Sequence, residues 1–199
     1  MKLRATALIL AAVASLSFGQ SRPVAIDVYM SGRDASDQLL GPGTPMASDI
    51  FKKIGVRLTW HRGELPAGRS AFGIHTVEHA PASATPGALA ASRLTDAAGV
   101  EITVYQDRVQ RFLDGHPSLT GVAAGYVLAH ELAHAMQGVA RHSESGILKA
   151  QWSGEDFTEM IYHKLVFTSY DVELIHRGLA VRMASRQPEA VTKASEALR

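Results

Sequence analysis

The segment that most constrains the fold runs from Thr120 to Gln137. It is rich in apolar residues and contains no proline, which predicts a largely buried α-helix. Gly138 follows at once, and glycine is common where a helix ends. Two histidines and a glutamate nevertheless lie inside this segment: His130, Glu131 and His134. Because polar groups are costly to bury without partners, their presence in an apolar helix indicates a site.

The spacing of the two histidines suits a metal ion. His130 and His134 are four residues apart, so their imidazoles share one helical face and both can bind one zinc ion. Glu131 lies about 100° further round the helix, beside the metal instead of on it. There it can accept a proton from a water molecule that the metal has made acidic. The sequence therefore predicts His130 and His134 as Zn²⁺ ligands and Glu131 as a catalytic general base.

A catalytic zinc site needs a third protein ligand and an open position for water. His142 follows His134 by eight residues, and Gly138 allows the chain to leave the helix and turn back between them. Glu159 is the alternative, since a carboxylate on a later helix supplies the third ligand in other zinc peptidases. We expect His142 to be the third metal ligand.

These residues resemble the metzincin zinc peptidases, and within them the matrixin type. The family pattern is H-E-x-x-H-x-x-G-x-x-H, often followed by serine, and six residues carry the resemblance here: His130, Glu131, His134, Gly138, His142 and Ser143. Two features depart from it. The glycine and the third histidine come four and eight residues after His134, where the family has three and six, and Leu148 occupies the position of the family's methionine.

The resemblance implies a zinc metalloendopeptidase, a hydrolase in which a peptide or protein substrate lies extended along an edge strand near Ala88 to Ser92. Zinc would polarise the scissile carbonyl, and Glu131 would activate water and pass its proton to the leaving amine. The alternative is a zinc-binding, peptidase-like scaffold or binding protein without significant proteolysis. The intact Glu131 favours the enzyme, whereas Leu148, in place of the family's methionine, is compatible with the scaffold alternative.

The rest of the chain predicts strands first and helices last. Alternating β-branched and apolar residues predict strands at 23–30, 56–60, 71–77 and 100–105, and 88–94 fits either a short strand or a helical turn. We expect a loop over 32–45, a short helix over 48–54, and further helices over 155–166 and from 169 to about 185. This order predicts an α+β fold: a mixed twisted sheet, the active-site helix and a C-terminal helical part, as in metzincins.

The first residues predict an export signal. Lys2 and Arg4 precede an apolar run from Leu8 to Phe18, and Ser17 and Gly19 place small residues at the two positions that a signal peptidase reads. This pattern is typical of a signal peptide at 1–19, so we expect a secreted or periplasmic protein. The zinc metallopeptidase domain would cover 20–186, and 187–199 would form a loosely ordered tail.

Composition excludes several function classes. Lys and Arg total 20 against 19 Asp and Glu, so the net charge of +1 gives no reason to expect nucleic acid. The chain has no cysteine, which excludes disulfides, thiol catalysis and cysteine zinc sites. No later apolar segment has transmembrane length, so we expect no stable membrane insertion after signal removal. We expect a monomer.

A second histidine pattern lies in the first half of the chain. His75, Glu78 and His79 match H-x-x-E-H, the inverted zinc-peptidase motif. That motif requires a helix, but Gly73 and Pro81 bracket the segment and its β-branched residues favour a strand. We therefore expect no metal at this pair.

Overall fold

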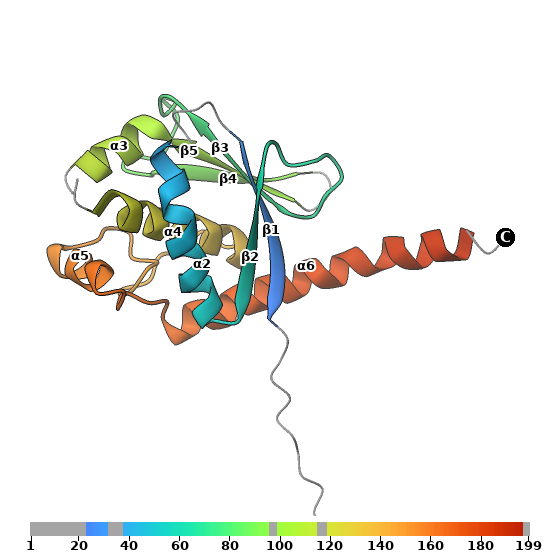
Figure 1. The fold of residues 1–199 in the computed structure, drawn as a ribbon. Coiled ribbons are helices and arrows are strands. Elements are labelled where there is room, and N and C mark those ends of the chain that lie inside the picture. Colours follow the sequence, from blue (N-terminus) through green and yellow to red (C-terminus); the bar gives the residue numbers. More distant parts are fainter. Residues whose placement is uncertain (1–22, 32–37, 96–98, 115–118, 197–199) are drawn as a thin grey trace, which may run out of the picture.

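The structure, a computed structural model, describes residues 23–31, 38–95, 99–114 and 119–196. The predicted signal peptide at 1–19 lies outside the described residues. Figure 1 shows a sheet with helices packed against it, and a long C-terminal helix whose far half projects away from the rest of the fold. None of the helices in the described ranges is long and apolar enough to cross a membrane.

Five strands form one sheet in the order β2-β1-β3-β5-β4. Strands β2, β1, β3 and β5 run parallel to one another, whereas β4 pairs antiparallel with β5 and forms one edge. The strands are β1 (Val24–Ser31), β2 (Val56–Arg62), β3 (Phe72–Val77), β4 (Ala90–Leu94) and β5 (Val100–Tyr105). The predicted α+β fold with a mixed sheet is confirmed.

One face of the sheet is covered by helices. Alternate strand residues such as Val28, Ile74 and Ile102 are fully buried in one core cluster with the helices, as the two-residue period of a strand requires. The helical elements are η1 (Gly41–Gly43), α2 (Thr44–Lys53), α3 (Gln106–Asp114), α4 (Thr120–Gln137), α5 (Gly154–Ile161) and α6 (Ser169–Glu196).

Helix α4 lies at the centre of this core and has the bounds that the sequence predicts. Most of its residues are buried, and η1, α2, α5 and α6 all pack against it. Two glycines allow close approach. A Cβ on Gly125 would lie 2.5 Å from the Cβ of Met46, and a Cβ on Gly178 of α6 would lie 2.0 Å from the carbonyl oxygen of Met136. Both distances are far below van der Waals contact, so α4 is held closely on two sides.

Several helix boundaries differ from the prediction. The segment expected as loop over 32–45 is helical throughout its described part, from residue 38, and α2 begins at Thr44 because Pro45 suits the first turn of a helix. Helix α3 was not predicted, although Val109 and Leu113 give it a buried face. Helix α5 ends at Ile161, not at 166, and α6 continues past 185 to Glu196.

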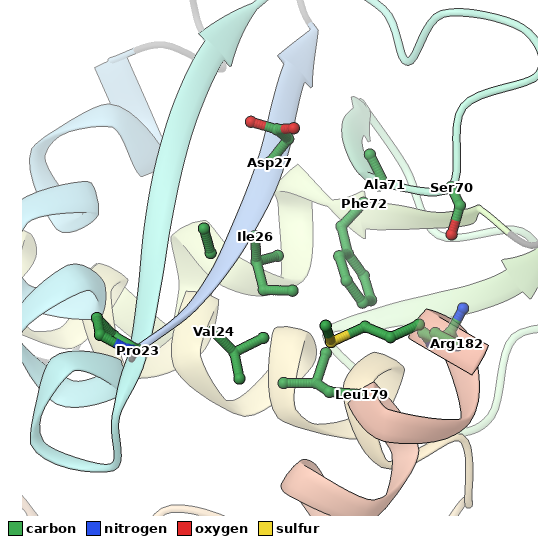
Figure 2. A pocket seen from close by; sticks show the side chains of 11 residues that line it. Pro23, Val24, Ile26, Asp27, Ser70, Ala71, Phe72, Leu179 and Arg182 are labelled. Atoms are coloured by element: carbon green, nitrogen blue, oxygen red, sulfur yellow. The ribbon is translucent and has the colours of Figure 1, made fainter. Parts of the chain in front are cut away.

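A cavity of about 350 Å³ lies between the sheet and α6, away from the predicted site residues. Figure 2 shows Val24 and Ile26 of β1, Phe72 of β3 and Leu179 of α6 around it. Arg182 also lines it, with its guanidinium 5.3 Å from the centre of the Phe72 ring and hydrogen-bonded to the carbonyl of Ala135 at 3.0 Å. No predicted site residue lines this cavity.

We predict that Gly125→Ala destabilises the protein by about 1–3 kcal/mol, because the added methyl overlaps Met46 and the packing must shift. Gly121→Ala on the same helix is the matched control, since its Cβ would meet nothing closer than 3.5 Å. The control should be neutral or gain up to about 1 kcal/mol from helix propensity. Urea unfolding of both variants measures the difference, and equal stability would contradict the close packing of α2 on α4.

Candidate metal centre

The structure brings three predicted ligands together. Ligand nitrogens of His130, His134 and His142 all lie within 4.8 Å of one another, the one such group of His, Cys, Asp and Glu found among the described residues. The ring centres of His134 and His142 are 4.9 Å apart, and those of His130 and His142 are 5.5 Å apart. Helix α4 supplies two of these side chains and the loop that follows it supplies the third.

A backbone carbonyl orients the first imidazole. Nδ1 of His130 lies 2.9 Å from the carbonyl oxygen of Ile147, so the ring donates its Nδ1 proton there and directs its Nε2 lone pair towards His134. The indole of Trp152 also donates to this oxygen, at 3.2 Å, and its ring lies edge-on to His130. Histidines that bind a metal through one ring nitrogen usually donate a hydrogen bond from the other, as His130 does here to Ile147.

The electrostatics of the cluster favour neutral imidazoles. Burial lowers the pKa of His130 to about 4 and that of His134 to about 3, so both rings are neutral at pH 7. Their Nε2 atoms are only 3.0 Å apart, close enough to share a proton that a cation would replace. Three imidazoles whose nitrogens converge on one point are a suitable donor set for Zn²⁺, and the cluster therefore fits the site of a zinc peptidase.

Glu131 lies next to His130 on α4 and is only partly exposed. Burial raises the pKa of its carboxyl to about 7. A carboxyl group with such a pKa exchanges a proton easily near neutral pH, which is the property that a general base and general acid requires.

The loop with His142 leaves α4 through Gly138, whose φ of 68° is in the left-handed region that favours glycine. The loop is tied back on itself, since the amide of Ser143 donates to the carbonyl of Leu148 at 2.7 Å. Gly146, with a φ of 77°, makes the turn between them, and a Cβ there would lie 2.3 Å from the carbonyl oxygen of Val166. The backbone therefore brings both Ile147 and His142 to the end of α4.

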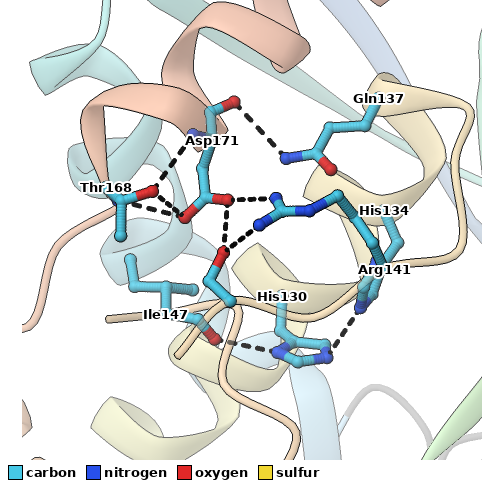
Figure 3. Close-up of polar contacts among 8 residues, drawn as sticks. His130, His134, Gln137, Arg141, Ile147, Thr168 and Asp171 are labelled. Atoms are coloured by element: carbon cyan, nitrogen blue, oxygen red, sulfur yellow. Dashed lines mark hydrogen bonds and ion pairs between the residues drawn. The ribbon is translucent and has the colours of Figure 1, made fainter. Parts of the chain in front are cut away.

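A buried carboxylate joins this loop to α6, as Figure 3 shows. Asp171 is fully buried, and its Oδ1 accepts hydrogen bonds from Arg141 at 2.7 Å and from Ser143 at 2.6 Å. Its Oδ2 accepts from the hydroxyl of Thr168 at 2.7 Å and from the Thr168 amide at 3.1 Å. Burial alone would raise the pKa of Asp171, but these hydrogen bonds outweigh it and leave the pKa below its usual value.

The other sequence candidates lie outside the cluster. Glu159 is exposed on α5 and is not part of the histidine group, whereas Leu148 is fully buried. His75 lies on a strand, as predicted, and is hydrogen-bonded to Thr103 at 2.9 Å. His79 lies next to Glu78 in a well-exposed turn.

Sequence reasoning missed Asp171 and the carbonyl of Ile147. The signal for Asp171 was Thr168 three residues before it, since a hydroxyl residue followed at that distance by a carboxylate is typical of a helix start. No sequence signal identifies which carbonyl faces a histidine.

We predict that the stability of the metal-free protein falls in acid partly through Asp171. Its folded pKa lies below the unfolded value of about 3.9, so its stabilisation is complete above roughly pH 4 and is lost as the pH falls through the folded pKa. Asp171→Asn should cost about 3 kcal/mol at pH 7, because it leaves Arg141 without its buried partner. The difference in unfolding free energy between Asp171→Asn and wild type should become smaller below about pH 4.

Urea unfolding with a chelator present, measured from pH 7 down to pH 2, tests this prediction. Asp49→Asn is the control, since it removes the same charge from an exposed position on α2. Its unfolding free energy should depend on pH in the same way as that of wild type. A constant difference between Asp171→Asn and wild type at every pH would rule out the ionised carboxylate as the cause.

Comparisons with known proteins find likeness in structure alone. No protein-family model matches the chain, and no curated protein matches it in sequence. Among solved structures, the crystal structure of archaemetzincin from Methanopyrus kandleri is similar, with 17% identity, a TM-score of 0.48, and coverage of 78% of this chain and 96% of that chain. The GM1-bound form of the ECX AB5 holotoxin is also similar, with 10% identity, a TM-score of 0.38 and 80% of each chain covered.

Proposed function

We propose that this protein is a secreted or periplasmic zinc-dependent metalloendopeptidase of the metzincin type, with a variant of the matrixin pattern. One observation carries the proposal: ligand nitrogens of His130, His134 and His142 converge to within 4.8 Å of one another, and Glu131 follows His130 on α4. The secretory location rests on the predicted signal peptide alone, and we propose that the mature protein is a monomer.

The three histidines would hold the metal, which when bound supplies a Lewis acid that polarises a carbonyl and lowers the pKa of water. Glu131 would then move the proton. It takes one from the water that attacks the carbonyl carbon, and returns it to the amine nitrogen as the C–N bond breaks. The burial that raises the pKa of Glu131 to about 7 supports both directions of this transfer.

The edge of the sheet supports the choice of a peptide as substrate. Strand β4 pairs with β5 on one side only, within the described residues, and also contacts α4. Most of its residues are exposed. A substrate chain in extended conformation would add to this edge through main-chain hydrogen bonds, with its scissile bond carried past the end of α4.

We predict that Glu131→Gln keeps the zinc but abolishes hydrolysis, since the amide cannot accept the proton. Glu159→Gln is the matched control, because it makes the same change at an exposed position on α5. Zinc content and cleavage of a panel of denatured proteins would be measured together. Equal cleavage by wild type and Glu131→Gln at equal zinc content would disprove the general base, and zinc without cleavage in wild type would favour the scaffold.

We further predict that His142→Ala lowers zinc affinity by more than 100-fold, since losing a direct ligand costs more than the roughly 10–100-fold typical of its supporting residues. Glu159→Ala should change the affinity little, because Glu159 is not in the cluster. The double variant His75→Ala/His79→Ala should keep full zinc stoichiometry. Competition with a chromophoric chelator measures the affinities, with each fold checked by circular dichroism. A loss of zinc affinity in Glu159→Ala, with wild-type affinity in His142→Ala, would make Glu159 the third ligand in place of His142.

A further inference from the structure

We propose that Asp171 is a positioning residue for the metal centre. Its buried carboxylate holds both chain neighbours of His142 and so keeps that imidazole where it meets His130 and His134. The inference rests on the metal-binding part of the proposed function and is independent of whether the site hydrolyses peptides.

The third imidazole has no support of its own. In the described part of the chain, the ring of His142 contacts the rings of His130 and His134, and no hydrogen bond fixes either of its nitrogens. Its side chain is exposed, in contrast to the half-buried His130, which the carbonyl of Ile147 orients. The position of His142 therefore depends on how firmly its backbone is held.

Asp171 holds that backbone from both sides of His142. Arg141 and Ser143 converge on the same oxygen, Oδ1, at 2.7 Å and 2.6 Å. Arg141 also donates to the hydroxyl of Ser143 at 3.0 Å, so the side chains of the two neighbours of His142 are bonded to each other as well as to Asp171. Charge-assisted hydrogen bonds of this length are among the strongest in proteins, so the loop has little freedom to swing outward.

Only a carboxylate suits this position. The groups that face its two oxygens are all donors: the guanidinium of Arg141, the hydroxyls of Ser143 and Thr168, and the amide of Thr168. The side-chain amide of an asparagine would direct its own N–H groups either at the donors of Arg141 and Ser143 or at those of Thr168. The guanidinium and the backbone amide cannot become acceptors, and a buried mismatch of this kind is costly.

Asp171 is itself fixed to the helix that carries the other two ligands. It lies in the first turn of α6, and its backbone carbonyl accepts from the side chain of Gln137, the last residue of α4, at 3.3 Å. Further along α6, Gly178 allows close packing on the carbonyl of Met136. The carboxylate thus connects the His142 loop to α6, which packs directly against α4.

Titration of the purified protein with Co²⁺ tests the inference, because the visible absorption of Co²⁺ reports its ligands. Asp171→Asn should bind Co²⁺ about 10–100-fold more weakly than wild type. Its spectrum should shift towards that of His142→Ala. Thr168→Val is the matched control, since it removes the hydroxyl at Oδ2 and leaves both loop contacts at Oδ1. It should lower stability while keeping the Co²⁺ affinity and spectrum.

A double-mutant cycle separates positioning from general destabilisation. If Asp171 acts through His142, adding Asp171→Asn to His142→Ala should cause no further loss of Co²⁺ affinity. The inference would be overturned if Asp171→Asn lowered the Co²⁺ affinity equally in the wild-type and His142→Ala proteins. A folded Asp171→Asn with wild-type Co²⁺ affinity and spectrum would also overturn it. If Asp171→Asn does not fold, Ser143→Ala replaces it, since that variant removes one contact to Oδ1 and should weaken Co²⁺ binding in the same non-additive way.

The two proposals fail in different ways. A wild-type protein that binds no Co²⁺ would overturn both. Tight binding that depends on His142 and Asp171, together with no hydrolysis of any denatured protein, would overturn the peptidase and leave the positioning role intact.

Discussion

The structure depends on the burial of α4. This helix is the centre of the hydrophobic core, and η1, α2 and α6 pack around it. Its apolar side chains supply much of the burial that stabilises the fold, yet the same helix carries His130, Glu131 and His134. Their surroundings disfavour charge on all three groups, so burial makes the imidazoles neutral and the carboxyl a proton acceptor near neutral pH.

The groups that support the site come from the chain after α4. A carbonyl at Ile147 orients one imidazole, and a carboxylate at Asp171 ties down the loop that carries another. Neither group belongs to the histidine motif. Both reach the site because the chain turns at Gly138 and Gly146 and because α6 then packs back on α4. The motif supplies the donor atoms, and the later segments place them.

Sequence reasoning succeeded where a strong local pattern agreed with the tertiary structure. The bounds of α4, the mixed sheet and the strand at His75 all follow from periodicity and from glycine and proline positions. It failed where packing or capping decided the outcome. Helix α3 has only a short buried face, α5 ends after two turns, and α2 begins within a glycine- and proline-rich segment that resembles a loop. The extra residues between His134 and His142 left the geometry open, because turn length alone does not fix where a loop side chain lies.

The close contacts at Gly125 and Gly178 have a consequence for the energetics of metal uptake. They hold α4 on two sides, so His130 and His134 belong to a rigid pair that loses little conformational entropy on binding. The side chain of His142 is exposed and no hydrogen bond fixes its ring, so ordering that side chain carries most of the entropic cost. The entropy of metal uptake should therefore be governed by the freedom of one side chain, and changes that restrict it would raise affinity without adding any ligand.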